Sequence, residues 1–198
     1  MLARFSALLI GTLALASLRA QYDALPEPMA LWPVAQKVWL MAGYFTVLTN
    51  LGVAGLMFAV ARRWRMGASV AAGLVVSIVM VGSIYHLLLA SLLNPQGLAW
   101  WANEGLHTAV PVAVCVWWLA FADKAVGWRD LPLWLIWPAV YCAALLVRGY
   151  ATGFWPYPFL DGDALGALPL MLNIVGLLAA FAALGAGLVG VARFLRQR

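Results

Sequence analysis

Three polar side chains share one face of an otherwise apolar stretch near the start of the chain. In "YFTVLTN", residues 44–50, Thr46, Thr49 and Asn50 lie three and four positions apart, which places them side by side on a helix. Polar groups in a membrane helix are expensive, so they tend to face the bundle interior and mark function. A threonine hydroxyl becomes a useful nucleophile only when a base lies beside it. A nucleophilic role for a threonine would therefore require an ionisable side chain from another segment at the same depth in the membrane.

Further polar side chains fall near the corresponding ends of the other apolar segments. His86 lies near the end of its segment, and His107 lies about one turn into the next, just after Glu104. The same level includes Arg148, Tyr157, Asp161 and Asn173. The opposite halves of these segments hold almost no polar side chains beyond terminal arginines. This asymmetry predicts one polar pocket near the outer face.

Each of these residues also has a purely structural interpretation. A membrane threonine often bonds a carbonyl of its own helix, and an asparagine often links two helices. A lone histidine is commonly a structural group whose hydrogen bonds are satisfied. The long side chain of Arg148 can extend its guanidinium group to the membrane interface. The positions of these residues along the segments thus predict a polar pocket but do not by themselves indicate a reaction.

The elements that must position these residues are membrane helices. The chain has 198 residues, of which 66% are hydrophobic and 10% charged. A soluble domain has about a quarter charged residues, and apolar runs of about 20 residues can each cross a bilayer. The sequence predicts an all-α, polytopic membrane protein formed by a single six-helix domain over residues 1–198. The expected spans are 5–22, 36–61, 68–93, 104–122, 131–150 and 165–192.

The basic residues predict the orientation. With the N-terminus inside, 9 of the 12 Lys and Arg residues fall on the cytoplasmic side, and only Arg19, Lys37 and Arg148 fall outside. The positive-inside rule then places both termini in the cytoplasm. The net charge of +5 follows from this distribution and implies no nucleic-acid partner. The first span is expected to be retained rather than cleaved, and the mid-span Cys115 and Cys142 are expected to be free thiols.

Three sequence motifs resemble those of a known family and occur in the order and at the spacing found there. "YFTVLTN" (44–50), "NEGLHTAVP" (103–111) and "RGYATGFWPYPFLD" (148–161) are similar to the androgen-induced gene family, which includes the androgen-dependent TFPI-regulating protein. The resemblance is closest to the bacterial six-helix branch and covers the chain from the second to the sixth expected span. This chain has Glu104 where animal members often carry another histidine, and Thr49 where they carry an acidic residue.

The resemblance implies a membrane-embedded threonine hydrolase that cleaves fatty acid esters of hydroxy fatty acids (FAHFA). Carried over by motif, Thr46 is the nucleophile and neutral His107 the general base. Expected oxyanion or substrate-binding groups are Asn50, Tyr157 and Arg148, with Asn173 in the same layer, while His86 or Asp161 would orient the base. The expected substrate is a lipid or fatty acyl ester in the outer leaflet of a bacterial inner membrane. No cofactor and no metal are implied, and nothing in the sequence indicates an oligomeric state.

Two other classes of function fit the same polar layer. One is a non-catalytic lipid-binding or transporter-like bundle, although no internal repeat of the kind typical of transporters is apparent. The other is a metal or haem site, because His86 and His107 are expected at one level. No metal-ligand spacing such as a His-Glu-x-x-His segment supports the second alternative.

Overall fold

The computed structural model describes residues 1–197, so Arg198, one of the residues in the charge count, lies outside the described part. Helices account for most of residues 1–197, and no strand occurs among them, as the composition predicts. Contacts group the chain into two compact units: unit 1, Met1–Ala125, and unit 2, which begins at Val126. The single domain expected from the sequence stays a prediction.

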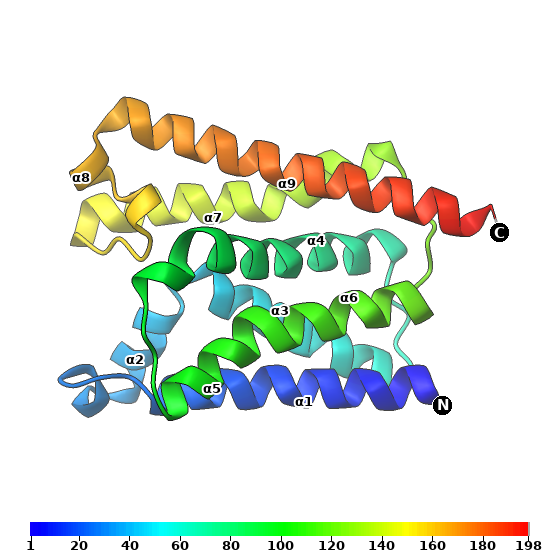
Figure 1. Cartoon of the computed structure of the whole chain (residues 1–198), viewed down its shortest axis with the longest axis horizontal. Helices are drawn as coiled ribbons and strands as arrows, with labels where there is room; N and C mark the ends of the chain where they lie inside the picture. Colours follow the sequence, from blue (N-terminus) through cyan, green and yellow to red (C-terminus); the bar gives the residue numbers. More distant parts are fainter. Residues whose placement is uncertain (198) are drawn as a thin grey trace. The chain divides into compact units, whose positions relative to one another are not determined.

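Figure 1 shows the helices of both units. Unit 1 contains α1 (Leu2–Asp23), η1 (Met29–Leu31), α2 (Val34–Met41), α3 (Phe45–Ala61), α4 (Ala68–Ile84), η2 (Tyr85–Leu89), η3 (Ala90–Leu92), α5 (Leu98–Glu104), η4 (Gly105–Ala109) and α6 (Val110–Phe121). Unit 2 contains η5 (Trp128–Asp130), α7 (Leu131–Thr152), η6 (Pro158–Leu160), α8 (Gly162–Leu165) and α9 (Ala167–Arg196).

Within residues 1–197, five continuous helical segments are long and apolar enough to cross a membrane: Leu2–Asp23, Ala68–Leu92, Leu98–Phe121, Trp128–Thr152 and Ala167–Arg196. A bent pair, α2 and α3, brings the number to six if the pair is one span. The chain therefore has the character of a helical membrane protein. The segment Leu98–Phe121 corresponds to the fourth expected span, 104–122, and begins six residues before it, because α5 already starts at Leu98 after Gly97.

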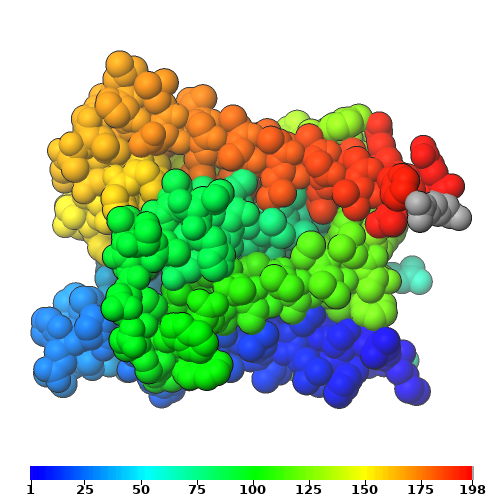
Figure 2. Space-filling view, in the orientation of Figure 1, coloured from blue at the N-terminus to red at the C-terminus, as the bar shows by residue number. Residues whose placement is uncertain are grey.

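The second expected span, 36–61, is not one continuous helix. Its two parts, α2 and α3, meet at 95°. The chain leaves the helical conformation at Tyr44, which is extended (φ −101°, ψ 127°) and follows the weak helix former Gly43. Figure 2 shows the segment that includes α2 projecting at one end of unit 1. As a result Thr46 lies in the first turn of α3 and not in the middle of a long helix.

In unit 1, α1 packs along α3 and also contacts α5 and α6. A buried cluster of Leu18, Met41, Val47 and Leu106 joins α1, α2, α3 and η4 at the level of the bend. Gly105 lies directly against Ser17 of α1, where a β-carbon would collide with the serine side chain. The start of α3 and the η4 turn are therefore held against the same part of α1.

In unit 2, α7 and α9 pack along each other. Gly185 of α9 lies against Leu131 and Trp134 of α7. The connection between α7 and α9 folds into η6 and α8, with Trp155 donating to the Asp163 carboxylate at 2.8 Å. The loop is thus a folded element of unit 2.

A glycine allows α4 to approach the η4 turn closely. A β-carbon on Gly82 would lie 2.8 Å from the backbone oxygen of His107, which is closer than real β-carbons come to other atoms. Gly55 of α3 is also helical, and a β-carbon there would meet nothing within 4 Å. These two glycines form a matched pair for testing the contact.

We expect Gly82→Ala to destabilise the protein by about 1–3 kcal/mol, because the new methyl group must push α4 away from a backbone atom. Gly55→Ala should leave stability unchanged or raise it by up to about 1 kcal/mol through helix propensity alone. Thermal unfolding of both variants in detergent measures the difference. Equal melting temperatures would show that the close approach of α4 to His107 does not exist in solution.

Candidate active site

The hydroxyl of Thr46 and the imidazole of His107 meet between two helical segments of unit 1. Thr46 lies in the first turn of α3, and His107 lies in η4 between α5 and α6. Their atoms Oγ1 and Nε2 are 3.3 Å apart, within hydrogen-bonding distance. Both side chains are half-buried. The two residues that the family resemblance selects are therefore in direct contact.

The second nitrogen of His107 determines the direction of this hydrogen bond. Nδ1 lies 3.0 Å from the backbone oxygen of Asn103. A carbonyl oxygen can only accept, so Nδ1 carries the hydrogen, and in the neutral ring Nε2 must then be the acceptor. Thr46 accordingly donates its hydroxyl hydrogen to His107. This assignment follows from the hydrogen-bond partners.

The buried side chain of Tyr85 contacts the imidazole, and the buried side chain of Asn103 contacts Tyr85. The ring of Tyr85 stacks on that of His107, with centroids 4.2 Å apart and planes 22° apart. The side-chain amide of Asn103 donates to the hydroxyl of Tyr85. Tyr85 begins η2, so the contact also connects the end of α4 to α5 and η4.

The position of His107 depends on a wider helical turn. In η4 the N–H of Val110 bonds to the oxygen of Gly105, five residues back, so this stretch is a π-turn. Pro111 follows and has no N–H, so it cannot bond to the oxygen of His107 four residues before it. Turns of this kind inside α-helices are frequent at functional sites.

Asn50 supplies a donor where the π-turn leaves an oxygen without its usual partner. Its Nδ2 donates to Leu106 O at 3.3 Å and to Thr46 O at 2.9 Å. The amide has two hydrogens, and both are used by these oxygens. Asn50, which is fully buried, therefore ties α3 to η4. The oxyanion role that the sequence suggested for Asn50 stays a prediction.

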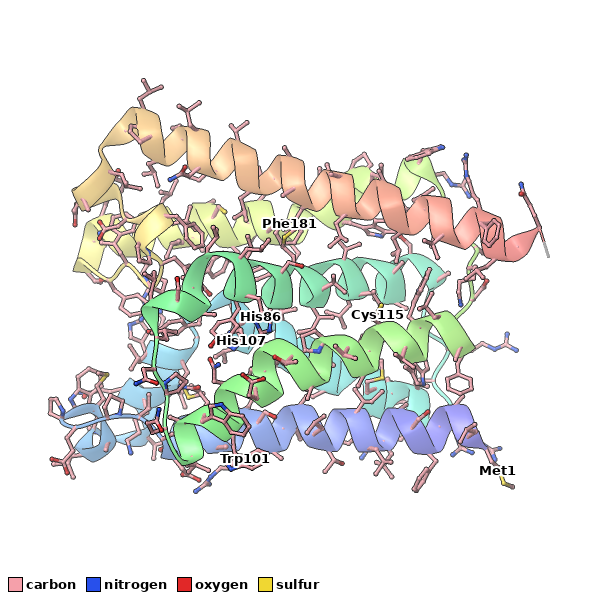
Figure 3. The ribbon with its side chains drawn as sticks, viewed as in Figure 1. Met1, His86, Trp101, His107, Cys115 and Phe181 are labelled. Atoms are coloured by element: carbon pink, nitrogen blue, oxygen red, sulfur yellow. The ribbon has the colours of Figure 1, made fainter. Side chains whose placement is uncertain are left out.

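A second histidine–threonine pair lies beside the first. His86 Nε2 is 3.0 Å from Thr108 Oγ1, and the rings of His86 and Tyr85 form a T-shaped contact with centroids 5.0 Å apart. Figure 3 shows His86 and His107 in the same region of unit 1. His86 is exposed and lies in η2, which is also a π-turn. The η4 turn thus presents His107 to α3 and Thr108 to η2.

The other four predicted site residues belong to unit 2. Arg148 lies over the ring of Phe154, with its guanidinium carbon 4.2 Å from the ring centroid, and buried Tyr157 stacks on Phe159. The Asp161 carboxylate caps α8 by accepting from two backbone N–H groups, and exposed Asn173 donates to Phe159 O at 2.9 Å. The substrate-binding and orienting roles suggested for these residues stay predictions.

Sequence reasoning did not select Tyr85, Asn103 or Thr108 as site residues. Asn103 and Thr108 are part of the "NEGLHTAVP" motif, and Pro111 at its end was the available signal for an irregular turn. Nothing in the sequence shows that the Tyr85 ring would face His107. Among residues 1–197, no group of three or more His, Cys, Asp or Glu side chains is arranged to hold a metal ion.

Comparison of the chain with protein-family models, curated proteins and solved structures finds no match.

We expect Asn50→Leu to destabilise the protein by about 1–3 kcal/mol, because the oxygen of Leu106 would be left buried without a donor. Asn173→Leu is the matched control: it removes one hydrogen bond at an exposed position and should have a smaller effect, about 0.5–1 kcal/mol. Chemical denaturation in detergent measures both. Equal losses would contradict the role of Asn50 as the link between α3 and η4.

Proposed function

We propose that this protein is an integral membrane hydrolase of lipid carboxylic esters, with Thr46 as nucleophile and His107 as general base. The observation that carries the proposal is the hydrogen bond from the Thr46 hydroxyl to Nε2 of an imidazole whose Nδ1 is held by a carbonyl. A nucleophile, a base and a group that orients the base form the pattern of covalent hydrolytic catalysis. The family resemblance adds fatty acid esters of hydroxy fatty acids as the substrate class.

The reaction proceeds in two halves. In the first, Thr46 Oγ1 attacks the ester carbonyl while its proton passes to His107 Nε2. The tetrahedral intermediate collapses, the bond to the alcohol oxygen breaks, and that oxygen takes the proton from Nε2. In the second half, water gives a proton to Nε2 and attacks the acyl group on Thr46. The carboxylic acid leaves as the proton returns to Thr46, so neither protons nor electrons are gained or lost by the enzyme.

The negative oxygen of the intermediate needs donors close to Thr46. Thr46 is the second residue of α3, and the first N–H groups of a helix have no acceptor within the helix. They also carry the positive end of the helix dipole. Its own backbone N–H is therefore our candidate donor, in the way that the nucleophile's N–H serves serine proteases. Removing one such donor typically lowers the rate about 10²–10³-fold.

We expect Thr46→Val and His107→Ala to lose hydrolysis of a chromogenic ester, falling to the rate of buffer, because each removes one half of the proton transfer. Thr12→Val on the exposed face of α1 is the matched control and should keep wild-type turnover. Activity of purified protein in detergent is the measurement. Equal turnover by wild type and both site variants, above that of buffer, would remove the pair from the mechanism.

Covalent labelling distinguishes the Thr46–His107 pair from the neighbouring Thr108–His86 pair. A fluorophosphonate probe should attach to Thr46, and only when His107 is present, because the hydroxyl depends on the base. Attachment to Thr108, the hydroxyl beside His86, would move the reaction to the second pair and contradict our assignment. Mass spectrometry of the labelled peptide distinguishes the two.

A second candidate function is binding or transport of a lipid without turnover. The break between α2 and α3 favours it, since interrupted helices line the substrate sites of many transporters. Uptake by proteoliposomes in the absence of ester turnover would support this candidate over the hydrolase.

The orientation in the membrane is part of the proposal. We place six spans, α2 and α3 counted together, in a bacterial inner membrane with both termini in the cytoplasm, on the basis of the basic residues. A reporter that fluoresces only in the cytoplasm should be active when fused after the last residue. Alkaline phosphatase, which is active only outside, should be active when inserted in the loop between η3 and α5. The reverse pattern would overturn the orientation.

A further inference from the structure

Two residues outside the reacting pair contact the imidazole of His107. Asn103 accepts the hydrogen of Nδ1 through its backbone oxygen, and Tyr85 lies flat against the ring. Both are buried, and the amide of Asn103 donates to the hydroxyl of Tyr85. The ring of Tyr85 thus restrains the orientation of the imidazole plane, and the backbone oxygen of Asn103 restrains the Nδ1 side of the ring.

These two contacts act on different properties of His107. The bond to Asn103 O determines which nitrogen carries the hydrogen, because a carbonyl needs a donor opposite it. The stacked ring of Tyr85 opposes rotation of the imidazole, which would exchange the directions of its two nitrogens. If either restraint is lost, Nε2 no longer faces Thr46 as a constant acceptor. A misplacement of about 1 Å in a reacting group can lower a rate about 10²-fold.

We propose that Tyr85 and Asn103 are positioning residues that hold His107 in the tautomer with hydrogen on Nδ1 and with Nε2 directed at Thr46. This inference rests on the proposed hydrolase function for its consequence on the rate, but the tautomer itself can be observed without any substrate. Tyr85 acts through its ring on the imidazole, and its hydroxyl keeps that ring in place through Asn103.

The chain contains only two histidines, which makes a direct test practical. Protein labelled with ¹⁵N-histidine gives nitrogen signals from His86 and His107 alone, and His86→Phe assigns them by elimination. At pH 8, above the ordinary imidazole pKa of about 6.5, we expect His107 to show a protonated Nδ1 and an unprotonated Nε2. A His107 signal from the opposite tautomer, or from an average of the two, would overturn the proposal.

Variants of Tyr85 test its ring and its hydroxyl separately. Tyr85→Leu removes the stacked ring, so the signals of His107 should move toward a mixture of tautomers. Turnover should fall about 10- to 100-fold in kcat with little change in KM, because substrate binding is not touched. Tyr85→Phe retains the ring, should keep the tautomer and should lose less activity. Tyr141→Leu, a buried tyrosine of unit 2, is the control for loss of a large ring.

The outcomes distinguish this inference from the proposed function. A tautomer held in wild type and lost in Tyr85→Leu, with no ester turnover by either protein, supports the positioning role and contradicts the hydrolase. Turnover by wild type with an unchanged His107 spectrum in folded Tyr85→Leu contradicts the positioning role alone. If Tyr85→Leu does not fold, as judged by size-exclusion chromatography, Tyr85→Trp retains a flat ring. A mixed tautomer in that variant would overturn the proposal.

Discussion

The missing amide hydrogen of Pro111 is the constraint around which the candidate site is arranged. A proline inside a helix cannot bond to the oxygen four residues before it, and here that oxygen belongs to His107. The helix widens before the proline, with Val110 reaching back five residues to Gly105. The widened turn carries His107 and Thr108, and their side chains bond to residues of α3 and η2 respectively. A regular α-helix through this stretch would require a different hydrogen-bond pattern and a different placement of both side chains.

The neighbouring helices accommodate the oxygens that the turn exposes. Asn50 reaches from α3 to the oxygen of Leu106, and Gly82 lets the backbone of α4 come close to the oxygen of His107. Gly105 permits the same turn to lie against Ser17 of α1. An irregular backbone inside a membrane protein is tolerated where protein surrounds it. The residues that accommodate the turn therefore also fix the geometry between the Thr46 hydroxyl and the His107 imidazole.

The sequence predicted the helices far better than the site. Long apolar segments are recognisable from composition because the bilayer requires a minimum length, and in the described part of the chain five of the expected spans appear as continuous helical segments. The bend at Tyr44 was not predicted, because the apolar pattern of 36–61 continues across it. The contact between Thr46 and His107 agrees with the pairing that the resemblance suggested, whereas position along the helices predicted only a shared level. Tyr85 and Asn103 were missed since their importance depends on a tertiary contact that no spacing records.

The right-angled break before Thr46 bears on how water would reach the site that we propose. Thr46 lies in the first turn of α3, next to the bend and to the short helix α2. If α3 crosses the membrane as we propose, this first turn lies near the boundary between the lipid headgroups and the hydrocarbon. Under the proposed mechanism, the acyl tails of an ester would stay in the hydrocarbon while its carbonyl sits at this boundary. The water of the second half-reaction would then arrive from the aqueous phase without crossing the hydrocarbon.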